Sequence, residues 1–188
     1  MDTPPTIRDI SGRSDLLDEV GRLRVFAWKT ETGATPETDC WIDPVDREPG
    51  TRLYAIFSGD RIVASARLTI HTDLAQAPDA AVYAGVFASP PEPPIAVLSR
   101  LVVHPDVRRR GFGTALDRHR IDTARGLGCR TVVGSSSAPR RIAQLEALGF
   151  WIAGRQNHNP HAAFSGRGVQ SVLVRVLEAA ESEGAFDQ

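Results

Sequence analysis

The chain has 188 residues, of which 41% are hydrophobic and 24% charged, and its formal net charge is −1. This length and apolar content are enough for one domain over residues 1–188, folded from about 9 to 177. A near-neutral chain has no general basic field that would attract nucleic acid or an anionic membrane. With no apolar run of membrane-spanning length and no secretion-type start, we expect a cytoplasmic protein, either a monomer or a homodimer.

The first half of the chain predicts a helix and a hairpin. Apolar residues recur at helical spacing from Ser14 to about Thr30. Residues 52–57 and 61–70 are β-rich runs separated by a Ser-Gly-Asp turn, which is typical of a hairpin. Residues 73–95 are rich in alanine and proline and predict a loop, because the prolines cannot join a sheet ladder.

The second half predicts alternating strands and helices. An apolar strand over 95–104 stops at Pro105 and leads through a turn into a helix over 114–128. Leu116, Ile121, Ala124 and Leu127 share one face of that helix, although Asp117 and Arg120 interrupt it. A strand over 130–137, a helix over 139–148 and strands over 150–154 and 169–177 follow. This order predicts an α+β fold with a mixed sheet.

The turn "HPDVRRRGFGTAL" is the feature that points to a ligand. Two glycines, Gly111 and Gly113, would let the backbone approach an anion, and Arg108–Arg110 add positive charge just before a helix begins. A phosphate or pyrophosphate fits this arrangement best. The turn lacks the third glycine of the dinucleotide fingerprint and the Gly-Lys-Ser/Thr of a P-loop.

The stretch "LVVHPDVRRRGFGTAL", with "LEALGF" as a later helix end, resembles the GNAT N-acetyltransferase superfamily. The resemblance implies a three-layer α/β/α fold with a splayed, mostly antiparallel sheet that binds acetyl-CoA or another acyl-CoA. It places a pyrophosphate on the motif and the pantetheine arm along the preceding strand edge. The residues implied are Leu101, Val102, Val103, Arg108, Arg109, Arg110, Gly111, Phe112, Gly113 and Thr114.

The proton-transfer residues common in this superfamily are missing from the sequence. The usual glutamate position falls on Val97, the tyrosine on Leu145 and a frequent asparagine on Ala138. His71 and His104 follow predicted strands and are candidates for proton transfer, because imidazole is suited to that role near neutral pH. His71 should lie near the substrate cleft and is also a candidate for substrate binding. A solvated strand-end histidine is the commoner case.

A serine and two arginines stand inside otherwise apolar strands. Ser99 and Arg100 alternate and should face opposite sides of the sheet. Arg67 and Arg100 would either pair with aspartates, namely Asp39, Asp43 or Asp46, or clamp a substrate carboxylate.

Three further features leave alternatives open. Ser135, Ser136 and Ser137 either line the acceptor site or cap the next helix, and Ser136 is our candidate for substrate binding. His158 and His161 lack a third ligand, so we expect a substrate loop and no metal. Cys40 and Cys129 are too few for a disulfide framework and should be reduced.

A second resemblance is to acyl-homoserine-lactone and N-acyl amino acid synthases, which share the fold and take acyl chains from acyl carrier protein. Its matching residues are Arg22, Phe26, Asp43, Asp46, Arg67, Ser99 and Arg100.

We predict an N-acyltransferase that moves an acetyl or short acyl group from CoA to the amine of a small molecule. An acceptor that also bears a carboxylate is one option. Attack is direct, deprotonation runs through water, and the backbone N–H of Val103 polarises the carbonyl, with Ser99 and His104 as further catalytic candidates. The alternatives are a carrier-protein-dependent synthase and a non-catalytic CoA-binding regulatory domain.

Overall fold

The structure is a computed structural model that describes residues 5–32, 36–157 and 169–178. Its centre is a sheet with the strand order β1-β2-β3-β4-β5-β7-β6. The strands are β1 (Ile7–Asp9), β2 (Arg52–Ser58), β3 (Arg61–His71), β4 (Ile95–Val103), β5 (Thr131–Ser136), β6 (Trp151–Gln156) and β7 (Gln170–Val176). The β4–β5 pair is parallel and the other pairs are antiparallel.

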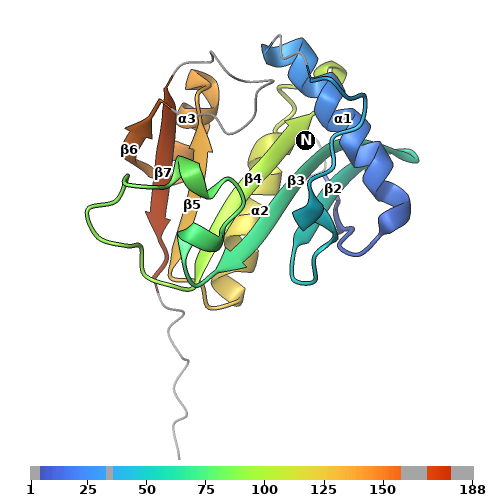
Figure 1. The fold of residues 1–188 in the computed structure, drawn as a ribbon. Coiled ribbons are helices and arrows are strands. Elements are labelled where there is room, and N and C mark those ends of the chain that lie inside the picture. Colours follow the sequence, from blue (N-terminus) through green and yellow to red (C-terminus); the bar gives the residue numbers. More distant parts are fainter. Residues whose placement is uncertain (1–4, 33–35, 158–168, 179–188) are drawn as a thin grey trace, which may run out of the picture.

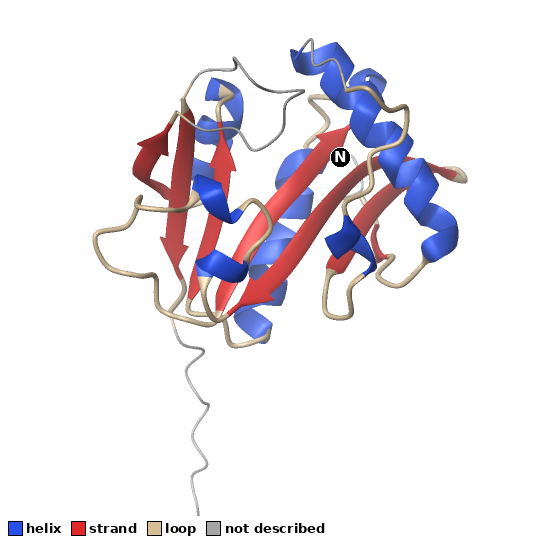
Figure 2. Ribbon diagram, in the orientation of Figure 1, coloured by secondary structure: helices blue, strands red, loops and turns tan. Residues whose placement is uncertain are grey.

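Helical segments cover both faces of the sheet (Figures 1 and 2). On one face lie α1 (Ser14–Thr32) and three short 3₁₀ helices, η1 (Pro44–Arg47), η2 (Leu74–Gln76) and η3 (Ala80–Val82). On the other lie α2 (Phe112–Gly126) and α3 (Pro139–Glu146). A fourth 3₁₀ helix, η4 (Pro105–Val107), connects β4 to α2. The expected α+β, three-layer architecture with a mixed sheet is therefore confirmed.

Short elements escaped the sequence analysis. β1 has three residues, none of them buried, so it carries no apolar alternation. The 3₁₀ helices are turns stabilised by local side-chain bonds: the Asp73 carboxylate accepts from the N–H of Ala75 at the start of η2, and Asp46 accepts from the N–H of Asp43 at the start of η1. Such segments lack a helical period.

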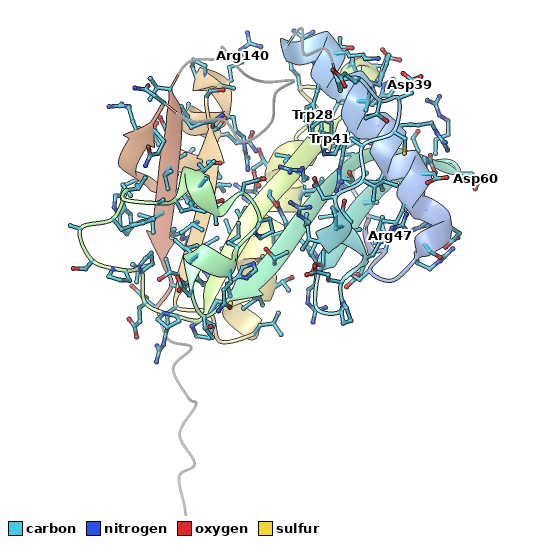
Figure 3. All side chains as sticks on the ribbon, viewed as in Figure 1. Trp28, Asp39, Trp41, Arg47, Asp60 and Arg140 are labelled. Carbon is cyan, nitrogen blue, oxygen red and sulfur yellow. The ribbon has the colours of Figure 1, made fainter. Side chains whose placement is uncertain are left out.

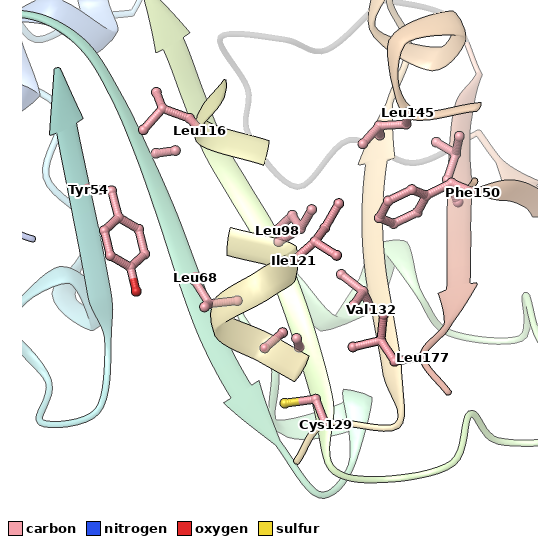
Figure 4. Packing of buried hydrophobic residues seen from close by; sticks show 14 of the residues in the cluster. Tyr54, Leu68, Leu98, Leu116, Ile121, Cys129, Val132, Leu145, Phe150 and Leu177 are labelled. Carbon is pink, nitrogen blue, oxygen red and sulfur yellow. The ribbon is translucent and has the colours of Figure 1, made fainter. Parts of the chain in front are cut away.

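The main core lies between the sheet and α2, and Figure 4 shows its packing. Leu116, Ile121 and Ala124 of α2 are buried there. The fourth expected member, Leu127, is 43% exposed, and the expectation was wrong because the helix ends at Gly126 and Leu127 is its C-cap. Asp117, which interrupts this face, is nonetheless buried.

The sheet divides beside β4. β4 and β5 pair over four positions, from Ile95–Thr131 to Leu98–Gly134, and then separate. Beyond that point β4 also carries a bulge against β3: Ser65 faces Val102 and Arg67 faces Ser99, so one β3 residue stands opposite two of β4. Arg100, in the bulge, has a left-handed φ of 52°.

The core assignment predicts unequal costs for two leucines of the α2 segment. Leu116→Ala should lower the free energy of unfolding by about 2–5 kcal/mol, because Leu116 has no exposed surface and its removal leaves a cavity. Leu127→Ala, at the exposed end, should cost about 0.5 kcal/mol or less. Urea unfolding of both variants measures this, and equal costs would contradict the packing described for α2.

Candidate functional site

A cavity of about 490 Å³ opens where β4 and β5 separate. Its walls come from the end of β4, the start of α2, the end of β5 and the start of α3. Trp28 from α1 and Arg140 from α3 both lie at this end of the molecule (Figure 3). The lining residues are Trp28, Asp79, Val82, Leu98, Ser99, Arg100, Leu101, Val103, Arg108, Arg109, Gly111, Phe112, Gly113, Thr114, Ser135, Ser136, Ser137, Ala138, Arg140, Arg141, Gln144 and Gln170.

The glycine-rich turn forms one end of this cavity. Arg109 and Gly111 both have positive φ, of 65° and 80°, which turns the chain into the first turn of α2. The space in front of Gly111 is open, with no atom within 4 Å of where a Cβ would stand. Because the first N–H groups of a helix have no intrahelical partner, the start of α2 presents donors and a positive dipole end to the cavity. This end suits a phosphate group.

Arginines dominate the charge of the cavity. Arg100, Arg108, Arg109, Arg140 and Arg141 line it, against one carboxylate, Asp79, among the described residues. A highly phosphorylated ligand fits such a surface.

A buried carboxylate joins the two helices that begin at the cavity. Asp117 of α2 accepts hydrogen bonds from Arg120, from both Nη atoms of Arg141 and from Nε2 of Gln144, the last at 2.8 Å. Burial opposes the ionisation of Asp117, but the charges of Arg141 and Arg120 hold its pKa below the usual range. The starts of α2 and α3 are thereby fixed relative to each other.

The edge of β4 offers backbone groups to the cavity. The N–H of His104 donates to the carbonyl of Val63 in β3 at 2.8 Å. Because successive N–H groups of a strand point to opposite sides, the N–H of Val103 is directed away from β3, toward the side that β5 has left. An extended, amide-bearing ligand can therefore pair with this edge.

A buried ion-pair network lies on the opposite face of β4 from α2. Arg67 Nη1 contacts Asp43 Oδ2 at 2.7 Å and Asp46 Oδ1 at 3.0 Å, and Arg24 Nη1 contacts Asp46 Oδ2 at 2.5 Å. Arg100 joins through Nε to Asp43 Oδ2 at 2.7 Å and reaches Asp79 through Nη1 at 2.9 Å. Three arginines and three aspartates therefore compensate one another.

The aspartates of this network are held ionised. Burial opposes the ionisation of Asp43, but hydrogen bonding to Arg100 and the charges of Arg100 and Arg67 place its pKa well below the usual range. The pKa of Asp46 is lowered in the same way, burial being outweighed by Arg24 and Arg67.

Residues 15–150 match the family model described as the Acetyltransferase (GNAT) family. The chain belongs to this family. The resemblance stated from the motif is thereby confirmed, and membership makes the protein an enzyme of the acetyltransferase class. Comparison with curated protein sequences finds no match.

Solved structures of GNAT proteins share the fold at low sequence identity. The ribosomal-protein-S18-alanine N-acetyltransferase from Escherichia coli is 20% identical, over 96% of this chain and 99% of that one, with a TM-score of 0.66. FeeM, an N-acyl amino acid synthase from uncultured soil microbes, is 13% identical over 92% and 91%, with a TM-score of 0.68. A Bacillus subtilis acetyltransferase in complex with CoA is 16% identical over 93% and 99%, with a TM-score of 0.59.

Eight of the ten residues expected around CoA line the cavity, and two do not. The side chain of Val102 is buried on the α1 side of the sheet, and Arg110 is exposed outside the cavity. Arg108 lines the cavity but is also tied to the protein, since its Nε donates to the carbonyl of Val103 and its Nη2 to that of Ala27. Its guanidinium is part of the scaffold of the turn.

Arg67 is a structural residue. Arg67 is fully buried, lies outside the cavity lining and is bonded to Asp43 and Asp46. Of the two alternatives, the internal ion pair is therefore correct, and the assignment of Arg67 to substrate binding was wrong. Asp39, a third suggested partner, is almost fully exposed and pairs with Lys29.

Ser99 and Arg100 do not face opposite sides as expected. Ser99 Oγ accepts from Arg67 Nε at 3.0 Å, while Arg100 reaches Asp43, so both side chains join the same network. The bulge breaks the alternation of the strand and explains the difference. From the other face, buried Arg120 donates to the carbonyls of Arg67 and Ser99 at 2.7 and 3.1 Å, which holds the bulge in place.

Neither candidate histidine lines the cavity. His71 pairs with Ile95, at the far end of β4 from the motif, and its Nε2 lies 2.9 Å from Thr69 Oγ1. His104 stacks on Phe26 with ring centroids 5.0 Å apart, and its Nδ1 accepts from the N–H of Asp106. The strands end where expected, but both rings lie outside this site.

The remaining predicted positions divide clearly. Ser135, Ser136 and Ser137 line the cavity. Ser136 Oγ accepts from the N–H of Ala138, but Ala138 is the N-cap of α3 and no side chain caps this helix, so the capping alternative was wrong. Val97 and Leu145 are buried in the core, which leaves no proton-transfer side chain at either position. His158 and His161 lie outside the described residues.

Several cavity residues escaped the sequence analysis, namely Trp28, Asp79, Arg140, Arg141, Gln144 and Gln170. Asp79 lies in a loop without a motif, and Arg140 and Arg141 had no role assigned from the sequence. Arg24 of α1 joins the network, whereas Arg22, a matching residue of the second resemblance, is exposed. The signal for Arg24 was a charged residue on the apolar stripe of a helix.

In the described part of the chain, no helix is long and apolar enough to cross a membrane. Within the same residues, no three His, Cys, Asp or Glu side chains form a group able to hold a metal ion. Cys129 is buried in the core and its pKa is raised by burial, and both cysteines are free thiols.

The network predicts a specific dependence of stability on pH. Because the pKa of Asp46 is lower in the folded than in the unfolded state, its contribution is complete above about pH 4 and is lost as the pH falls further. Asp46→Asn should therefore cost about 3–5 kcal/mol of unfolding free energy at pH 7, and the gap to wild type should narrow below pH 4. Denaturant unfolding from pH 7 to 3 measures this.

Asp39→Asn is the control, since Asp39 is exposed and should change stability by less than about 1 kcal/mol at any pH. A gap between wild type and Asp46→Asn that stayed constant from pH 7 to 3 would contradict the ionised network.

Proposed function

We propose that the protein transfers an acetyl or short acyl group from acyl-CoA to the amine of a small molecule. The arginine-lined cavity beside the split of β4 and β5 carries this proposal. The start of α2 would hold the pyrophosphate, and the edge of β4 would pair with the amides of the pantetheine arm. This arrangement would bring the thioester to the bulge at Arg100.

The chemistry is a direct transfer. The lone pair of the amine attacks the thioester carbonyl carbon, a tetrahedral oxyanion forms, and the C–S bond breaks. The N–H of Val103, directed away from β3, would stabilise the oxyanion. The described residues of the cavity lining include no histidine, and Val97 and Leu145 cannot move protons. The amine would therefore lose its proton to water and the CoA thiolate would take one from water.

A second candidate is a carrier-protein-dependent N-acyl amino acid synthase. It is favoured by one observation: Asp43, Asp46, Arg67, Ser99 and Arg100, five of the seven residues of that resemblance, form a single bonded network. The similarity of fold to FeeM agrees with it. The arginine-lined turn favours CoA, because it offers more positive charge than the single phosphate of a carrier-bound pantetheine needs.

Calorimetric titration with acetyl-CoA tests the proposed donor. Wild-type protein should bind, and Arg109→Glu and Arg140→Glu should each weaken binding roughly tenfold to a hundredfold, because each variant replaces a charge-assisted contact with repulsion. Arg61→Glu, an exposed arginine at the start of β3, is the matched control and should bind as wild type does. Folded wild-type protein that bound no acetyl-CoA would contradict the proposal.

The same preparation separates the two donors. Acetyl- or hexanoyl-CoA consumed in the presence of an amine, with no reaction of the corresponding acyl carrier protein, is the outcome we expect. Turnover of acyl carrier protein alone would establish the second candidate instead.

A further inference from the structure

Positive and negative side chains come from different parts of the cavity wall, and binding of the acyl-CoA donor does not account for the negative one. Of its described lining residues, Arg108, Arg109, Arg140 and Arg141 belong to the turn and to the start of α3, where CoA is proposed to bind. Asp79 is the one carboxylate and comes from the opposite side, from the loop between β3 and β4. The side chain of Asp79 is 20% exposed.

Asp79 has a strained backbone conformation and lies beside the bulge. It has a left-handed φ of 61°, and the described non-glycine residues with positive φ are Asp79, Arg100 and Arg109, which all line this cavity. Such conformations persist where the surrounding structure imposes them, and they concentrate at functional sites. The contact of 2.9 Å between Arg100 Nη1 and Asp79 Oδ2 fixes the carboxylate next to Arg100, one of the β4 residues that line the cavity.

Arg100 is already engaged with carboxylates of the protein. Its Nε and Nη2 contact Asp43, and its Nη1 contacts Asp79. With Arg24, Arg67 and Asp46 these residues form a network of three positive and three negative charges. A substrate carboxylate placed at Arg100 would therefore compete with two aspartates and be repelled by them.

We infer that Asp79 binds the amino group of the acceptor, and that the acceptor is an amine with no carboxylate on the carbon that bears it. This inference rests on the proposed function. The acceptor docks as an ammonium ion against Asp79 and loses one proton to water before its nitrogen attacks. The nitrogen gives up a second proton on forming the amide, the thiolate gains one, and the sum is amide, free CoA and one released proton.

The chemistry of Asp79 suits this binding role. A carboxylate accepts several hydrogen bonds, so it can bind an ammonium group while it stays paired with Arg100. Val82 and Trp28 line the same cavity and offer largely apolar surface to a hydrocarbon or aromatic body. Tyramine, tryptamine, histamine and agmatine are probes of this chemistry.

The experiment compares each of these four amines with its amino acid (tyrosine, tryptophan, histidine and arginine) and with the amino acid amide. The three members of a set share a side chain and differ at one carbon, which bears hydrogen, a carboxylate or a neutral carboxamide. Release of CoA from acetyl-CoA gives kcat/KM for each. We expect the amine and the amide to be used at least about tenfold better than the acid, because only the acid brings repulsion.

Asp79→Asn should lower kcat/KM for the amines by roughly tenfold to a hundredfold, mostly through KM, and should reduce the discrimination against the acids. Asp79→Glu should restore part of the activity. Asp73→Asn, in the same loop but exposed and outside the cavity, is the matched control and should match wild type. Unchanged acetyl-CoA affinity of Asp79→Asn shows that the variant is folded.

The outcomes separate this inference from the proposed function. Acids used as well as or better than amines, amides used as poorly as acids, or an Asp79→Asn variant as active as wild type, would overturn the inference and leave the acyltransferase proposal standing. Protein that binds acetyl-CoA but transfers to no member of any set would overturn both, because the inference names the acceptor of that reaction.

Discussion

The geometry of the cavity depends on the separation of β4 from β5, while β4 remains paired with β3. After Leu98 the strand has no β5 partner, and at Arg100 it carries an extra residue against β3. The two faces of the sheet secure that irregular backbone separately. Arg120 binds the carbonyls of Arg67 and Ser99 from the α2 side, while Asp43 binds the side chain of Arg100 from the α1 side. An irregular strand edge is costly, and the buried charges around it provide the bonds that the ladder lacks.

Buried charged groups also position the elements on two sides of the cavity. The carboxylate of Asp117 joins the starts of α2 and α3, so Arg140 and Arg141 of α3 are positioned by the packing of the two helices. On the other side of the cavity, the neutral network of Arg24, Arg67 and Arg100 with three aspartates ties the loop segments that carry η1 and η3 to α1, β3 and β4. Loop residues with strained backbones are thereby held against a rigid strand, as a binding site requires.

The sequence was informative where a period or a turn chemistry was strong. The hairpin, α1, α2 and the order of the later strands follow from apolar spacing, and the motif turn followed from its glycines and arginines. The sequence failed where a contact joined distant segments: nothing local distinguishes Arg67, which is buried in an ion pair, from an arginine that meets substrate, and Asp79 stands in a loop without a pattern. The bulge at Arg100 was invisible too, because an extra residue in one strand has meaning only against its partner. The readable signs of the networks were charged residues at apolar positions: Arg67 and Arg100 inside strands, and Arg24 and Asp117 on the apolar stripes of α1 and α2.

The backbone conformation favours glycine at one of the two glycine positions of the motif turn and not at the other. Gly111 has a φ of 80°, a conformation that costs other residues about 1–2 kcal/mol, and it faces open space. At Gly113 a Cβ would meet Gln144 and Leu101 at ordinary contact distances of 3.5 and 3.6 Å, so the folded chain has room for alanine there. In a library screened only for stable expression, position 111 would stay glycine while position 113 drifted toward better helix formers. A library screened for catalysis would hold both, and the difference between the two screens would show which part of the motif serves the ligand and which serves the chain.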